Sequence, residues 1–169
     1  MITTRQGRPE DSDRLREIDQ RTWSPQVAPM PREDPSTPFF GDRLAPADAL
    51  VAVTEDDVPC GYALLQQHTQ APSHAHVVLL NGLAVDPEHQ GQGIGRLLLE
   101  ATLAEARRRG ATKLSLRVLS TNEDAMRLYR SHGFVVEGTL RGEFVLDGRE
   151  VDDVLMACRL DAPDGPDGS

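Results

Sequence analysis

The chain has 169 residues, of which 38% are hydrophobic, enough for one domain with a buried core. Its 27 acidic residues outnumber its 18 basic ones, giving a net charge of −9, which argues against the basic footprint that nucleic-acid binding needs. No run approaches the roughly 20 apolar residues of a membrane span, and residues 1–5 carry no signal-peptide pattern, so we expect a cytoplasmic protein without membrane contact.

The first half of the chain predicts a β-α unit followed by a long loop and a hairpin. A cluster of prolines in the loop rules out a long helix there. The acidic run at 55–57 is typical of a turn between two strands. The expected elements are a strand over 2–8, a helix capped by Asp11 or Ser12, a loop with at most a short helix over 24–46, strands over 50–54 and 61–67, and a turn over 68–74.

The second half alternates strands and helices and ends in a hairpin. Asp147-Gly148 is the strongest hairpin signal in the chain. The expected elements are a strand over 77–85, a glycine-rich loop and a helix over about 92–109, a strand over 113–119, a helix over 123–132, and strands over 135–146 and 151–160. We therefore predict one domain over 1–160, followed by a disordered acidic tail over 161–169.

Three glycines, at 91, 93 and 95, join the apolar strand at 77–85 to the following helix. Glycine lets a backbone approach a ligand closely, and the free N–H groups of a first helical turn suit phosphate or pyrophosphate. The spacing does not fit a dinucleotide-binding fingerprint, because Arg96 stands where a glycine is needed. It does not fit a P-loop either, since the only lysine is Lys113. The loop is predicted to bind an anion.

The segment Gln90-x-x-Gly93-x-Gly95, after a strand that ends Val85-x-Pro87, resembles the signature of the GNAT superfamily of acyl-CoA N-acyltransferases. The resemblance implies an α/β (α+β) fold with a single GNAT-like domain. Its mixed, mostly antiparallel sheet of about seven strands would carry helices on both faces. The strands at 77–85 and 113–119 would splay apart and hold acyl-CoA between them.

The resemblance also implies which residues contact acetyl-CoA, mostly through the main chain. Backbone N–H groups from Gln90 to Gly95 would face the pyrophosphate, and Leu83 and Val85 would offer backbone groups to the acetyl carbonyl and the pantetheine. The expected set is Leu83, Ala84, Val85, Gln90, Gly91, Gln92, Gly93, Ile94, Gly95, Arg96, Asn122 and Tyr129. No metal is expected, and Cys60 and Cys158 are interpreted as buried packing residues.

Asn122 and Tyr129 complete the family pattern and share one helical face, two turns apart. The resemblance assigns Asn122 to the CoA arm and makes the Tyr129 hydroxyl the acid that protonates the departing thiolate. A tyrosine, with a pKa near 10, suits that role. The alternative is structural, with Tyr129 as a core residue and Asn122 as a helix cap.

The residue that deprotonates the attacking amine is left open by the sequence. Members that acetylate ribosomal-protein N-termini carry a glutamate base on the fifth strand, where this chain has Arg117. The candidates are Glu143, the pair Asp152 and Asp153, His76, and a chain of water molecules. Glu143 is placed with Tyr129 in the catalytic set. Each candidate side chain also has a purely structural interpretation, as an exposed strand charge, a buried anchor or an edge residue.

The resemblance leads to the prediction of an N-acetyltransferase that moves an acetyl group from acetyl-CoA to a primary amine by direct attack. One alternative makes a protein N-terminus the acceptor, and another is a module that binds acyl-CoA without turnover. Trp23, Phe39 and Phe40 could line the acceptor site or serve as hydrophobic anchors. Because the two C-terminal strands carry apolar residues at the end of the sheet, a homodimer is also expected.

Overall fold

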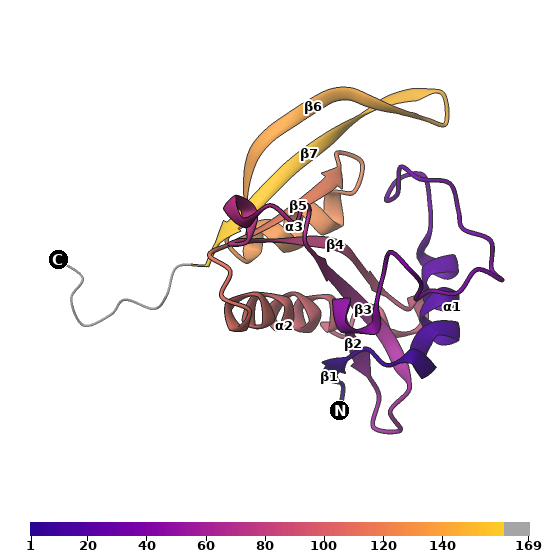
Figure 1. The fold of residues 1–169 in the computed structure, drawn as a ribbon. Coiled ribbons are helices and arrows are strands. Elements are labelled where there is room, and N and C mark those ends of the chain that lie inside the picture. The colour runs from indigo at the N-terminus through magenta and orange to yellow at the C-terminus, as the bar shows by residue number, and fades with distance from the viewer. Residues whose placement is uncertain (161–169) are drawn as a thin grey trace, which may run out of the picture.

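The computed structural model describes residues 1–160 and contains one seven-stranded sheet in the order β1-β2-β3-β4-β5-β7-β6 (Figure 1). All neighbouring strands are antiparallel except β4 and β5, which are parallel. The strands are β1 (Thr3–Gln6), β2 (Ala49–Val53), β3 (Pro59–Gln66), β4 (Val77–Val85), β5 (Lys113–Leu119), β6 (Val135–Leu146) and β7 (Arg149–Arg159). The main helices are α1 (Ser12–Thr22), α2 (Ile94–Arg108) and α3 (Glu123–Ser131).

The expected fold class is confirmed, and β4, β5 and β6 have the predicted bounds. Helix α2 begins at Ile94, not near residue 92, because Gly93 takes a left-handed conformation with φ of 77° and therefore precedes the helix. The last strand begins at Arg149, earlier than predicted, because the turn consists of Asp147 and Gly148 alone, with φ of 52° and 72°. The predicted disordered tail lies outside the described residues.

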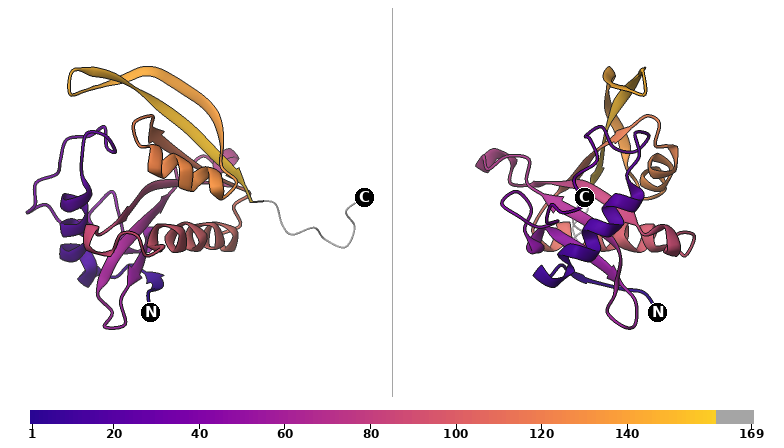
Figure 2. Two further views of the ribbon diagram at one scale, coloured as in Figure 1. Left: turned by 180° about the vertical axis from the view of Figure 1, so that it is seen from behind. Right: turned by 90° about the vertical axis from the view of Figure 1, so that its right-hand side faces the viewer.

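Helices cover both faces of the sheet, as predicted. Helices α2 and α3 pack on one face, over a cluster that includes Leu80, Leu116 and Met156. Helix α1 packs on the other face, where Leu15 and Ile18 meet side chains of β2 and β3. Figure 2 shows α1 on the opposite side of the sheet from α2. Within the described residues, no helix has both the length and the apolar character that a bilayer crossing would require.

The sheet divides between β4 and β5. These strands pair only from Val77 to Leu80 and from Lys113 to Leu116, and beyond these residues they no longer pair with each other. At the same level, β4 has two residues, Asn81 and Gly82, opposite a single residue of β3. This β-bulge shifts the alternation of β4 by one residue, so that Leu80 and then Leu83 face α2. The predicted splay is therefore present, and a bulge accompanies it.

Strands β6 and β7 form a long hairpin that arches away from the rest of the molecule (Figure 1). Strand β6 is the edge of the sheet. It exposes several apolar side chains to solvent, namely Val135, Val136, Leu140 and Val145.

Candidate active site

The edge of β4 that faces the split carries free backbone groups. The N–H of Asp86 donates to the Cys60 carbonyl on β3, at 2.9 Å. Because the backbone groups of successive strand residues point to opposite edges, those of Leu83 and Val85 point away from β3, toward the split. Among residues 1–160, the only group found to donate to the Val85 carbonyl there is the Gln90 side chain, at 3.2 Å. The split thus presents main-chain donors and acceptors at Leu83 and Val85.

The glycine loop ends in a helix start that is open to an anion. Gly93 is the N-terminal cap of α2 and supplies no side-chain hydrogen bond, so the first N–H groups of the helix remain available. A Cβ atom built on Gly91 or Gly93 would meet no protein atom within 4 Å. The space beside these backbones therefore suits a bulky group such as pyrophosphate, with the helix dipole favouring negative charge.

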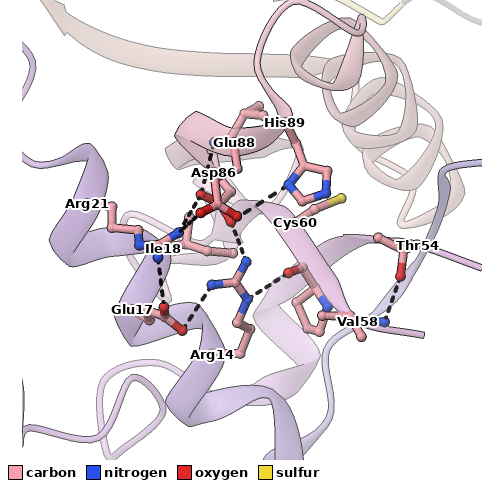
Figure 3. A network of polar contacts seen from close by, with 12 residues as sticks. Arg14, Glu17, Ile18, Arg21, Thr54, Val58, Cys60, Asp86, Glu88 and His89 are labelled. Carbon is pink, nitrogen blue, oxygen red and sulfur yellow. Dashed lines mark hydrogen bonds and ion pairs between the residues drawn. The ribbon is translucent and has the colours of Figure 1, made fainter. Parts of the chain in front are cut away.

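A buried carboxylate fixes the base of this loop. Asp86, whose side chain is 0% exposed, follows β4 directly and forms ion pairs with Arg14 and Arg21 of α1 (Figure 3). It also accepts a hydrogen bond from the Glu88 N–H, which caps a short turn at Pro87–His89. Burial alone raises the pKa of Asp86, but this N–H and the two guanidinium groups outweigh it and lower the pKa below its usual value. Asp86 is therefore charged at neutral pH.

The network around Asp86 ties α1 to the glycine loop. Glu17 pairs with Arg14 and Arg21 on the helix surface, and His89 of the loop lies 3.7 Å from Asp86. Sequence reasoning did not select Asp86. The available signal was an aspartate directly before a proline at the end of a buried strand, a pattern that favours the start of a turn.

Asn122 is the N-terminal cap of α3 and Tyr129 lies within this helix. The Asn122 side chain accepts a hydrogen bond from the Ala125 N–H at 3.3 Å, so it caps the helix, as its structural interpretation predicted. Tyr129 is 8% exposed and its ring lies 5.6 Å from that of Phe134. Its hydroxyl has no hydrogen-bond partner among the described residues. That hydroxyl remains available to a ligand.

Burial raises the pKa of Tyr129 to about 12. The hydroxyl is therefore fully protonated at neutral pH. The same shift makes it a weaker acid than a free tyrosine. Its chemistry is that of a hydrogen-bond donor to a group that becomes negative, more than that of a donor of a complete proton.

The candidate bases occupy very different positions. Glu143 is exposed on β6, which is separated from β4 by β5 and β7. Asp152 accepts a hydrogen bond from the Gly142 N–H at 2.9 Å, and the buried Asp153 pairs with Arg117. His76 precedes β4, at the end of the strand opposite the split, and so does not lie at the site.

Two hollows open where β5 ends. One, of about 380 Å³, is lined by Ser120 and by the outer face of α3. The other, of about 340 Å³, lies between the proline-rich loop and the tip of the β6–β7 hairpin, and it is lined by Pro25, Gln26, Thr121, Leu146, Asp147, Arg149 and Val151. The Thr121 hydroxyl donates to the Gln26 carbonyl at 2.7 Å and so holds the loop beside this second hollow.

The aromatic residues expected at the acceptor site do not line this hollow. Phe39 is buried beneath α1, where it packs against Phe40 and Tyr62. Trp23 donates its indole N–H to the Met30 carbonyl at 3.0 Å and thereby closes the loop on itself. The hydrophobic-anchor interpretation is therefore correct for Phe39, because α1 needs an apolar partner on its inner side.

Comparison with known proteins gives a family match over most of the chain. Residues 12–134 match the model of the acetyltransferase (GNAT) family. The [ribosomal protein bS18]-alanine N-acetyltransferase of Escherichia coli is 45% identical over 80 residues, which are 46% of this chain and 53% of that protein. The chain thus spans about half the length of this relative.

Two further relatives match most of the chain. The L-amino acid N-acyltransferase MnaT of Escherichia coli is 30% identical over 129 residues, 76% of this chain and 74% of that protein. The structure of yncA from Salmonella typhimurium, which contains its cofactor acetyl-CoA, superimposes with a TM-score of 0.78 at 25% identity and covers 100% of this chain and 99% of that one.

Proposed function

This chain belongs to the acetyltransferase (GNAT) family, and on that premise we propose that it transfers an acetyl group from acetyl-CoA to a primary amine. The observation that carries the proposal is the split between β4 and β5, which has free backbone groups on β4 and an open helix N-terminus at its end. Pyrophosphate would bind the N–H groups at Gly91–Arg96, and the pantetheine would lie along Leu83–Val85, with Asn122 and Tyr129 on the α3 side. Acetyl-CoA supplies an acetyl thioester when it is bound.

Tyr129 and the attacking amine would approach the thioester from opposite faces of the sheet. Tyr129 packs with Val118 and Val154 on the face of α2 and α3, so its hydroxyl would donate a hydrogen bond to the sulfur from that side. The Leu83 N–H would stabilise the negative charge that develops on the carbonyl oxygen. The neutral amine would attack the carbonyl carbon from the opposite face, forming the C–N bond and a tetrahedral oxyanion. Collapse of this oxyanion would break the C–S bond and release CoA as a thiolate, which takes its proton from solvent. The proton of the amine would pass to water, with Glu143 acting as base through that water.

The acceptor would enter by the hollow between the proline-rich loop and the hairpin tip. Free amino acids and protein N-termini are both candidates, because relatives named for each are similar to this chain. We further propose that the protein works in the cytoplasm as a homodimer, with the exposed apolar side chains of β6 covered by a second copy. Light scattering that gave a mass near 18.5 kDa at tens of micromolar would contradict the dimer.

Release of free CoA is the direct test of the activity. The protein is incubated with acetyl-CoA and a panel of amino acids, polyamines, aminoglycosides and short peptides, and the thiol is measured over time. We expect release above background with at least one class of amine. Binding of acetyl-CoA with no release for any amine would instead favour a module that binds acyl-CoA without turnover.

A further inference from the structure

One ion pair lies at the mouth of the split, on the face that α2 and α3 leave uncovered. Arg117 directly follows Leu116, the last residue of β5 that pairs with β4. It pairs with Asp153 of β7. The Asp153 side chain is 4% exposed and that of Arg117 is 49% exposed. The carboxylate is thus an internal anchor, while the guanidinium remains accessible.

The Arg117 side chain reaches across to β7 and toward the C-terminal end of β5, beyond the residues that pair with β4. Its partner Asp153 stands in register with Leu119, two residues further along β5. On the same face of β7, the next residue toward the hairpin tip is Val151, which lines the hollow of about 340 Å³. The guanidinium therefore lies beyond the end of the β4–β5 pairing, on the face of β7 that carries Val151 and leads to the hollow proposed for the acceptor.

Asp153 holds Arg117 by one edge only. The Nε–H donates to Asp153 Oδ2 at 2.6 Å, and one Nη2–H donates to the same oxygen. A guanidinium has five N–H donors, and the described residues supply no acceptor to the other three. The two Nη groups thus present a planar fork, a geometry that matches a carboxylate in a bidentate contact.

We propose that Arg117 binds a carboxylate of the acceptor, with Asp153 as its positioning residue. The acceptor is then a small amine that also carries a carboxylate, such as a free amino acid, and not the N-terminus of a protein, whose α-carboxyl is an amide. This inference rests on the proposed acetyl transfer and narrows its substrate class.

The test compares L-amino acids with their amides, which keep the amine and the side chain but lack the carboxylate. In the parent protein, kcat/KM for the best amino acid should exceed that for its amide by about tenfold or more, the scale of a charge-assisted hydrogen bond. Arg117→Met should bring this ratio down to about one, and Arg117→Lys should give an intermediate value. Arg159→Met removes an exposed arginine at the far end of β7 and should keep the parent ratio.

Two additions keep the test decisive. Because Arg117→Met leaves Asp153 buried without its partner, the double variant with Asp153→Asn is measured as well, and thermal melting confirms that it folds. Binding of the amino acid and of its amide to the CoA-saturated protein is titrated in parallel. A parent ratio near one, or an unchanged ratio in Arg117→Met, would overturn the proposal. Arg117-dependent binding without any CoA release would retain the carboxylate site but refute the acetyl transfer.

Discussion

Replacing Tyr129 by phenylalanine removes only the hydroxyl that we place at the sulfur of the thioester. Because that hydroxyl has no hydrogen-bond partner among the described residues, and because the ring keeps its contact with Phe134, the melting temperature should hardly change. With the pKa of Tyr129 at about 12, complete proton transfer to a thiolate whose pKa is about 8.5 would cost roughly 5 kcal/mol. The hydroxyl should therefore act by a hydrogen bond to the developing charge.

A hydrogen bond to a charged group contributes about 1.5–3 kcal/mol, which corresponds to a fall in kcat of roughly 10-fold to 150-fold. The assay is thiol release under saturating acetyl-CoA, accompanied by calorimetric titration of acetyl-CoA. We expect the affinity for acetyl-CoA to stay within about threefold, because the lost interaction forms only in the transition state. A variant that turned over at the parent's rate would refute this role and leave Tyr129 as a packing residue.

Three further predictions concern the glycine loop, the Asp86 network that supports it, and an ion pair near the end of α2. Gly93→Val places a β-branched residue at φ of 77° beside the proposed phosphate and should weaken acetyl-CoA binding by about tenfold or more. The control is Gly110→Val, at φ of 83° beyond α2, which should destabilise the fold to a similar extent but leave acetyl-CoA binding unchanged. Asp86→Asn breaks a buried pair and should lower the free energy of unfolding by about 3 kcal/mol in urea titrations, whereas Glu88→Gln, at an exposed partner of the same network, should change it little. Arginines of its own turn lower the pKa of Glu105 from 4.5 to about 2, so its contribution is present above pH 4.5 and is lost as the pH falls toward 2. Glu105→Gln should therefore reduce the acid-induced loss of stability by about 1–2 kcal/mol, less than the full shift because one arginine is exposed.

Local chemistry made much of the fold predictable. The paired turn residues Asp147 and Gly148 need left-handed backbones, and both adopt them. Strands β4 and β5 are apolar runs bounded by turn signals, so their bounds followed from the sequence. The start of α2 was predicted too early because the spacing of the three glycines does not show which of them is the last residue before the helix. That choice depends on where the chain must turn to pack Ile94 into the core.

The glycine loop of the candidate site could be located from local sequence, whereas contacts between side chains that are distant in sequence could not. Glycine spacing identified the loop, but the partners of Asp86 come from α1, more than 60 residues earlier. The pairing of Arg117 with Asp153 likewise depends on the register of β5 with β7. For Phe39 the sequence left two roles open, acceptor lining and hydrophobic anchor, because a loop aromatic carries no periodicity that reveals the buried face it packs on.

The split between β4 and β5 also has a consequence for how the protein folds. Strands β1 to β4 come from the chain before residue 86 and β5 to β7 from the chain after residue 112, so the two sides of the split are each built from a continuous stretch of sequence. Within the sheet a short parallel pairing joins them, and outside it the packing of α2 and α3 and the hydrogen bond from Thr121 to Gln26 add further contacts. Each stretch can gather mostly local contacts first, which favours rapid formation of two folding units that dock late. A ligand that lies in the split and touches both units would make their unfolding a single cooperative event.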